Sequence, residues 1–103
     1  MYQLSFYVPD SHLEAVKSAV FAAGGGTLGN YDSCAWQVQG QGQFRPRAGA
    51  NPHIGSVGQI EHVPEWRVEL IVRDEDVRAV VAAMRRAHPY EEPAFAVVRL
   101  EDF

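Results

Sequence analysis

The chain has 103 residues, 47% of them hydrophobic and 21% charged, with a formal net charge of −4. This length suits one domain around one hydrophobic core, and the apolar content excludes an intrinsically disordered chain. The acidic balance argues against a nucleic-acid-binding protein, which needs a basic surface to displace counterions. The sequence shows neither an apolar run of roughly 20 residues, as a membrane span requires, nor a secretory leader. Because the single Cys34 also excludes an internal disulfide, we expect a cytoplasmic protein with no membrane partner.

The N-terminal part of the sequence predicts a strand followed by a helix. Residues 2–8 alternate apolar and polar side chains and precede Pro9, as in a β-strand. Ser-His-Leu-Glu at 11–14 has the spacing of a helix capping box. Apolar residues at helical spacing follow, namely Leu13, Val16, Val20 and Ala23. Three glycines at 24–26 should end this helix, because glycine adopts the left-handed conformation at a helix C-terminus without steric cost.

The middle of the sequence predicts a long hairpin. Residues 33–39 alternate again and indicate a second strand, with Cys34 on its apolar face. From Gly40 to Gly58, glycines and prolines interrupt every period, so we expect a long loop over 40–58. Loops of this length in a compact domain usually serve a function or an interface. The strand pattern returns over residues 59–72, with a pause at Pro64.

The second helix and the last strand complete the predicted elements. Asp74 is a suitable N-cap, and the apolar residues over 77–84 lie at helical spacing. Basic side chains crowd the end of this helix, and Pro89 stops it. The β-branched and apolar run over 94–100 then predicts the final strand.

This order of elements predicts an α+β, ferredoxin-like split βαβ fold (βαββαβ). Such a fold has a four-stranded antiparallel sheet with both helices on one face. The other face would carry Phe6 or Tyr7 from the first strand and Trp36 or Gln37 from the second. Since an exposed aromatic face on a small domain is usually covered by another subunit, we expect a homo-oligomer.

The glycine-rich stretch 24–29 does not have the setting of a phosphate-binding loop. Such a loop lies between a strand and the N-terminus of a helix, where backbone N–H groups face the anion. Here the glycines follow a predicted helix and precede a predicted strand. We therefore interpret them as a tight turn.

The densest polar cluster is His-Pro-Tyr-Glu-Glu-Pro at 88–93. A histidine beside two carboxylates could hold a divalent metal or transfer protons. The alternative is a histidine at a helix C-terminus followed by a solvated acidic turn, and the single imidazole favours it. No metal-binding spacing relates the four histidines of the chain, His12, His53, His62 and His88. A metal site would therefore need residues that the fold or neighbouring subunits bring together.

Cys34 and two arginines are the remaining candidates for chemistry. A free cysteine in an alternating strand is more typical of a core than of a nucleophile, and no nucleophile-elbow motif is present. Arg45 and Arg47 flank Pro46 in the expected loop. They could bind a carboxylate, a phosphate or an acidic partner, or they could simply be solvated.

Four ordered segments of the sequence resemble a known family. They are Gly-Gly-Gly-Thr-Leu-Gly-Asn-Tyr-Asp-Ser-Cys (24–34), Gly-Gln-Gly-Gln-Phe-Arg-Pro (40–46), Ala-Asn-Pro-His-Ile-Gly (50–55) and Ala-His-Pro-Tyr-Glu-Glu-Pro-Ala (87–94). Together they resemble the YqfO-like, or Nif-three-like, family, and specifically the small PII- and CutA-like domain inserted in its longer members. The resemblance covers essentially the whole chain. It implies the ferredoxin-like fold and a tendency to form trimers, as CutA and PII proteins do.

The resemblance also implies which residues matter. The dinuclear metal site of the longer members belongs to a separate core domain, so we expect no catalytic residues over 1–103. The residues that carry over from the inserted domain are Asn30, Tyr31, Cys34, Phe44, Arg45, Pro46, Asn51, Pro52, Gly55, His88, Tyr90 and Glu91. As the ligand- or partner-binding set we single out Asn30, Tyr31, Cys34, Phe44, Arg45, Asn51, His88, Tyr90 and Glu91.

We therefore expect one PII/CutA-like domain over residues 1–103, acting as a regulatory, ligand-binding or protein-binding module without catalysis and without a cofactor. Its expected partners are further copies of itself, with a trimer favoured, and another protein or a small anionic ligand. The alternative is a metal-dependent, hydrolase-like protein. Its divalent metal would lie at a subunit interface around His88 and Glu91, with Cys34 or His53 contributing. A purely structural oligomer is the third possibility.

Overall fold

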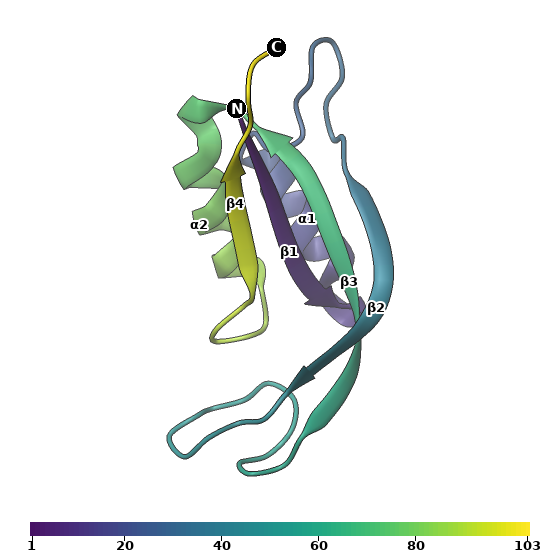
Figure 1. The fold of residues 1–103 in the computed structure, drawn as a ribbon, viewed down its shortest axis with the longest axis vertical. Helices are drawn as coiled ribbons and strands as arrows, with labels where there is room; N and C mark the ends of the chain where they lie inside the picture. The colour runs from purple at the N-terminus through teal and green to yellow at the C-terminus, as the bar shows by residue number, and fades with distance from the viewer.

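The computed structural model describes residues 1–103 and contains one antiparallel sheet with two helices packed on the same face (Figure 1). The strands are β1 (Tyr2–Pro9), β2 (Trp36–Phe44), β3 (Glu61–Val72) and β4 (Phe95–Arg99), in the spatial order β2-β3-β1-β4. The helices are α1 (Leu13–Ala22) and α2 (Val77–Ala87), preceded by the 3₁₀ turns η1 (Asp10–His12) and η2 (Asp74–Asp76). The predicted ferredoxin-like α+β class is confirmed.

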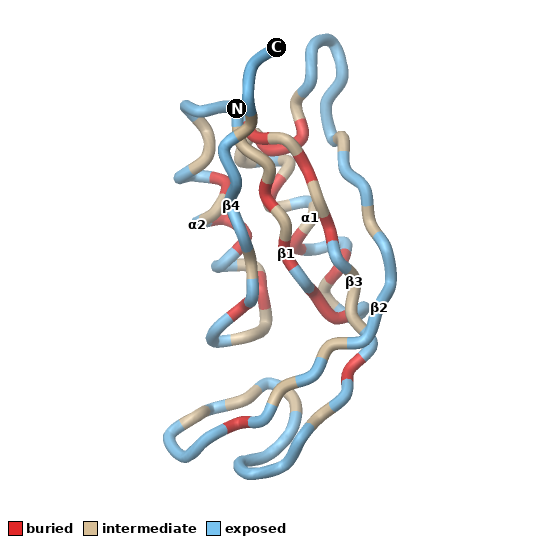
Figure 2. Tube along the Cα trace, viewed as in Figure 1, coloured by how far each residue is buried: buried red, intermediate tan, exposed pale blue.

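The hydrophobic core lies between the sheet and the two helices. β1 and β3 supply its sheet side with Leu4, Phe6, Val8, Val68, Leu70 and Val72. The helices cover these side chains with Leu13, Val16, Val20, Val80 and Met84. Figure 2 shows that burial is concentrated in the central strands and on the inner helix faces, while β2 and β4 are largely exposed. Burial of each large apolar side chain contributes roughly 1.5–3 kcal/mol, so this layer stabilises the fold.

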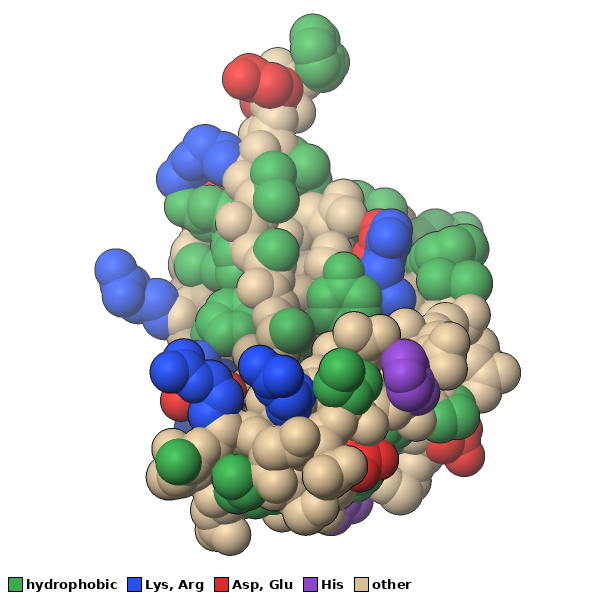
Figure 3. All heavy atoms as spheres, turned by 60° about the horizontal axis from the view of Figure 1, so that its bottom comes forward, with side chains coloured by type: hydrophobic (Ala, Val, Ile, Leu, Met, Phe, Trp, Pro, Cys, Tyr) green, Lys and Arg blue, Asp and Glu red, His purple; other side chains and the backbone are tan.

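The opposite face of the sheet is open in the single chain. Tyr7 and Trp36 lie on it and are 39% and 59% exposed, whereas Phe6, the neighbour of Tyr7, is fully buried. Gln37 faces the helices, because its side-chain oxygen accepts a hydrogen bond from Lys17 of α1 at 2.9 Å. In Figure 3, hydrophobic side chains are visible on the surface above the hairpin loop. The sequence pattern allowed either Phe6 or Tyr7, and either Trp36 or Gln37, on this face. The structure places Tyr7 and Trp36 there.

The β2–β3 hairpin is longer than the sequence indicated. Gly40 and Gly42 belong to β2, where they pair with Glu65 and Val63 of β3, so the loop starts after Phe44. The predicted loop over 40–58 is therefore wrong at its beginning, and the connection runs from 45 to 60. The ladder forms because glycine weakens a strand without preventing backbone pairing. The hairpin curves away below β1 and β4 (Figure 1).

Pro64 does not interrupt β3. The strand runs unbroken from Glu61 to Val72, and β1 ends opposite Glu65. Pro64 thus lies just beyond the end of β1. On the β1 side of β3 there is no neighbouring strand at this position, so the missing N–H of proline breaks no hydrogen bond there.

The predicted helix caps are not formed. The Ser11 hydroxyl contacts Nδ1 of its neighbour His12 at 2.8 Å, and neither helix has a side-chain N-cap hydrogen bond. Asp74 binds the terminal ammonium group of Met1 instead. At the start of α1 the 3₁₀ turn η1 satisfies one of the free N–H groups, since the Asp10 carbonyl accepts the N–H of Leu13. At the other end of α1 the predicted glycine stop is confirmed, with φ of 110° at Gly24 and 77° at Gly26. Neither helix has the length and apolar character needed to cross a membrane.

Candidate functional site

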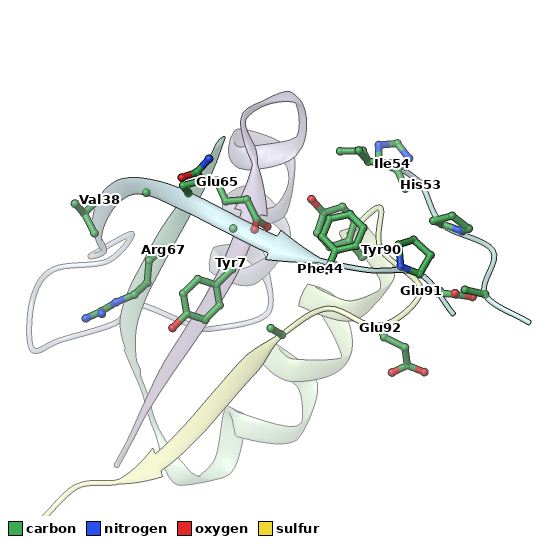
Figure 4. Close-up of a pocket in the computed structure, with 17 residues that line it drawn as sticks. Tyr7, Val38, Phe44, His53, Ile54, Glu65, Arg67, Tyr90, Glu91 and Glu92 are labelled. Carbon is green, nitrogen blue, oxygen red and sulfur yellow. The ribbon is translucent and has the colours of Figure 1, made fainter. Parts of the chain in front are cut away.

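A cavity of about 600 Å³ lies where the open sheet face meets the curved hairpin (Figure 4). Strands β1, β2 and β3 line one side of it. The loop 45–60 and the turn 88–94 line the rest. Three regions that are distant in the sequence therefore converge on one pocket: β1, the β2–β3 hairpin with its loop, and the turn 88–94. Its volume is in the range of small-molecule sites.

Two glycines of β2 make room for a carboxylate in this pocket. Gly40 pairs directly with Glu65, and Gly42 is the next residue on the same face of the strand. A Cβ atom at Gly42 would lie far inside van der Waals contact of Glu65 Oε1, whereas a Cβ atom at Gly40 would meet nothing within 4 Å. Only glycine at position 42 is therefore compatible with the observed position of the Glu65 side chain.

Glu65 is a half-buried carboxylate without an ion-pair partner. No Lys, Arg or His nitrogen lies within 4.0 Å of it, and Arg67 on the same strand binds Glu69 instead, with Nε donating to Oε1 at 2.6 Å. Burial raises the pKa of the Glu65 carboxyl, and the adjacent Tyr90 hydroxyl offsets part of this shift. Figure 4 shows Glu65 directed toward Tyr90 and Arg67 directed away.

The Tyr90 hydroxyl is buried beside the Glu65 carboxylate, and no hydrogen bond of good geometry satisfies it. Burial, and then the neighbouring Glu65 carboxylate, raise the pKa of Tyr90 to about 12. The phenol is therefore neutral under all physiological conditions. A buried hydroxyl without a partner costs free energy, about 1–3 kcal/mol in typical cases.

The Tyr90 ring organises an aromatic cluster that holds the loop against the turn. Its centroid lies 6.1 Å from Phe44, 6.2 Å from His53 and 4.9 Å from His88. The backbone N–H of Asn51 also donates to Glu91 Oε1 at 2.9 Å. These contacts close the loop 45–60 over the turn 88–94 and give the pocket its aromatic wall.

His88 is a structural residue at the end of α2. Its Nε2 lies 2.7 Å from the carbonyl oxygen of Tyr7, and its Nδ1 accepts the backbone N–H of Tyr90 at 3.1 Å. Nε2 therefore carries the proton, and the ring is neutral. Burial lowers the pKa of His88, with smaller contributions from His12 and His53. Because both ring nitrogens are already engaged, His88 has no free lone pair for a metal ion.

Of the nine predicted site residues, Phe44, Tyr90 and Glu91 line the pocket, and Asn51 and His88 lie behind it in contact with Glu91 and Tyr90. Arg45 directly follows Phe44 in the chain, but its side chain is exposed and does not line the pocket. No group of three or more His, Cys, Asp or Glu side chains is placed to hold a metal ion.

The remaining predicted site residues lie elsewhere. Tyr31 pairs with Leu28 across the tight turn at Gly29 and Asn30, and its side chain is 75% exposed. Cys34 lies before β2, half-exposed, with its thiol 3.6 Å from the Asp32 carbonyl oxygen. The core position predicted for Cys34 is therefore wrong, because β2 begins only at Trp36 and its even-numbered face is the open one.

Glu65 is the pocket residue that the sequence reasoning missed. Glu65 lies in a strand where polar and apolar residues alternate, and a polar residue at such a position is ordinarily predicted to face solvent. The available signal was the pair of glycines two residues apart in β2, since glycine in a strand often marks close approach of another group.

The fold places the chain in the class of CutA-like α+β domains. CutA from Xylella fastidiosa superimposes with a TM-score of 0.70 over 99% of this chain and 85% of that chain, at 17% sequence identity. An identity this low supports the shared fold alone.

The relatives by sequence are longer proteins. A "GTP cyclohydrolase 1 type 2 homolog" from Mycobacterium leprae is 52% identical over 94 residues, which are 91% of this chain and 24% of the relative. A Bacillus cereus protein related to NIF3 matches with a TM-score of 0.84 and 39% identity, over 98% of this chain and 26% of that chain. No protein-family model matches the chain. The chain is thus similar in sequence to a segment of these longer proteins and has a CutA-like fold, and it spans about a quarter of the length of the curated relatives it matches.

Proposed function

We propose that the chain is a non-catalytic regulatory or ligand-binding module that acts as a homo-oligomer and holds its ligand in the pocket described above. The observation that carries this proposal is the convergence of three sequence-distant regions on one cavity. Phe44 and Tyr90, which come from two separate family-like motifs, form its wall. The name of the mycobacterial relative refers to a protein about four times as long. A cyclohydrolase reaction is therefore not part of the proposal.

Two features support a role without catalysis. His88 uses both ring nitrogens to hold β1 and the turn, so it is not available as a general base. Tyr90, with its pKa raised to about 12, is too weak an acid to donate protons at neutral pH. The same engagement of His88 counts against the metal-dependent alternative. The predicted anionic ligand depended on Arg45 and Arg47, and neither arginine lines the pocket.

The open sheet face supports the homo-oligomer. Trp36, Val38 and Val98 are 59%, 41% and 57% exposed on it, and exposed apolar surface of this kind is typical of a subunit interface. Tyr7 and Val38 belong both to this face and to the pocket lining. A second copy on the face would therefore border the ligand. The family resemblance favours a trimer.

The test combines fragment binding with native mass. Fluorinated fragments are screened by ¹⁹F NMR against the wild type, Gly40→Leu and Gln39→Leu. A side chain at position 40 enters the open space of the pocket, whereas Gln39 is exposed on the other face of the same strand. We expect hits on the wild type and on Gln39→Leu that Gly40→Leu loses, and an oligomeric native mass. A library without hits, hits that Gly40→Leu retains, or a monomeric mass would each contradict the corresponding part of the proposal.

A further inference from the structure

The Glu65 pocket also indicates which kind of ligand it takes. Building on the proposed binding function, we infer that the ligand is a small organic cation, with an ammonium or guanidinium group carried on an apolar body. The ligand's charged group pairs with Glu65, and its body lies against the aromatic wall of Phe44 and Tyr90.

The missing partner of Glu65 is the first argument. A carboxylate removed from water is normally paired with a cation, because the desolvation of a charge is otherwise uncompensated. Arg67 is committed to Glu69, and Arg45 does not line the pocket. Glu65 therefore keeps an unused capacity for a positive partner inside a cavity that is open to solvent molecules.

The pocket wall is the second argument. Phe44 and Tyr90 present aromatic rings beside the carboxylate, and aromatic faces attract organic cations through the ring quadrupole. The Tyr90 hydroxyl is fully buried, so a ligand meets the ring and not the oxygen. Prolines and alanines of the loop and turn extend this apolar lining, which suits the hydrocarbon part of an amine.

Other ligand classes fit this pocket less well. A divalent metal ion requires several oxygen or nitrogen ligands, and Glu65 has no companion, since Glu91 is engaged by Asn51 and Glu92 points away from the rings (Figure 4). An anion would meet the Glu65 carboxylate, and Arg67, the arginine that lines the pocket, is already paired with Glu69. An organic cation is complementary to both the charge and the rings.

The experiment uses three probes that share a phenyl ring: 2-phenylethylamine (cationic), 2-phenylethanol (neutral) and 3-phenylpropionate (anionic). Affinities are measured by ¹H–¹⁵N NMR titration of the full chain. We expect the amine to bind about tenfold more tightly than the alcohol, with the carboxylate weakest. Equal affinity for amine and alcohol, or a preference for the carboxylate, overturns the cation inference and leaves the pocket as a binding site. Failure of all three probes, together with an empty fragment screen, overturns both proposals.

Two variants locate the effect. Glu65→Gln keeps the shape of the side chain and should remove the advantage of the amine while leaving the alcohol unchanged. Glu101→Gln makes the same change of charge on an exposed residue outside the pocket and should alter neither affinity. Retention of the amine preference in Glu65→Gln would overturn the assignment of Glu65 as the cation partner.

Discussion

The two faces of the sheet are built from the same strands and have opposite properties. On β1, Phe6 is fully buried under the helices, and its neighbour Tyr7 is 39% exposed on the other side. The helix-covered face is a closed apolar layer in which alternate residues of β1 and β3 contact α1 and α2. The open face combines exposed aromatic side chains with an unpaired carboxylate at Glu65. One face therefore stabilises the fold through its packing, and the other remains accessible in the single chain.

The open side lowers the stability of the single chain. Glu65 lacks an ion-pair partner, the buried Tyr90 hydroxyl lacks a hydrogen bond of good geometry, and the Trp36 side chain is 59% exposed. Each of these features would be replaced if stability alone were optimised. Local features that oppose stability are typical of functional surfaces.

The largest expected effect separates the two faces within one strand. Phe6→Ala should lower the free energy of unfolding by about 3–5 kcal/mol, because it opens a cavity in a packed core. Tyr7→Ala, the matched change on the open face, should cost less than about half of that, since Tyr7 is already partly hydrated. Urea denaturation of both variants provides the measurement. Equal losses would show that the open face contributes as much packing as the core.

His88 joins the two faces and should have the next largest effect. His88→Ala removes the hydrogen bonds to the Tyr7 carbonyl and the Tyr90 N–H, and we expect a loss of about 2–3 kcal/mol of unfolding free energy. His62→Ala is the control, because His62 is an exposed histidine of β3. A loss in the control similar to that in His88→Ala would contradict a specific structural role.

His88 should also make the fold sensitive to acid. Its pKa is lowered by burial, so the folded chain binds fewer protons than the unfolded chain, whose histidine titrates near 6.5. The stability it contributes is present above pH 6.5 and is lost as the pH falls through the pKa of the folded state. His12 and His53 lie nearby and add repulsion when protonated. Thermal melts between neutral and acidic pH should show this loss in the wild type and a smaller one in His88→Ala.

Trp36 should matter for assembly and little for the fold of one chain. Trp36→Ser should change the monomer's unfolding free energy by less than about 1 kcal/mol, because the indole is mostly exposed. The same substitution should lower the native mass, which light scattering can follow. Unchanged mass, or collapse of the fold, would remove this face as the proposed interface.

The smallest effect concerns Glu65 and has the opposite sign. Because burial raises the pKa of Glu65, the wild type is favoured at low pH and loses stability as the pH rises from near 4.5 through the folded value. Glu65→Gln should therefore be slightly more stable than the wild type at neutral pH, and this difference should disappear in acid. Melting temperatures across this range are sufficient. A destabilised Glu65→Gln at neutral pH would mean that the carboxylate has a partner in the folded chain.

Much of the fold could be predicted from periodicity. The helical spacing of Val16 and Val20 and the glycine stop at Gly24 predict α1, and the element order predicts the split βαβ arrangement. The ends of the strands could be predicted less well from the sequence. Gly40 and Gly42 look like loop residues, but pairing with β3 over the length of the hairpin outweighs their poor strand propensity. The motifs also singled out Tyr90 and His88, but not the contacts that these residues make in the fold.

The sequence by itself determined the class of fold and the similarity to a segment of longer, NIF3-related proteins, because alternation, helical spacing and ordered motifs are local properties. Only the tertiary structure decided that Glu65 faces Tyr90 without a cation, that His88 is occupied by backbone groups, and that Arg45 lies outside the pocket. These facts depend on the curvature of the hairpin and on contacts between residues far apart in the chain. No spacing along the chain encodes them, since charge compensation and burial arise only when distant segments meet.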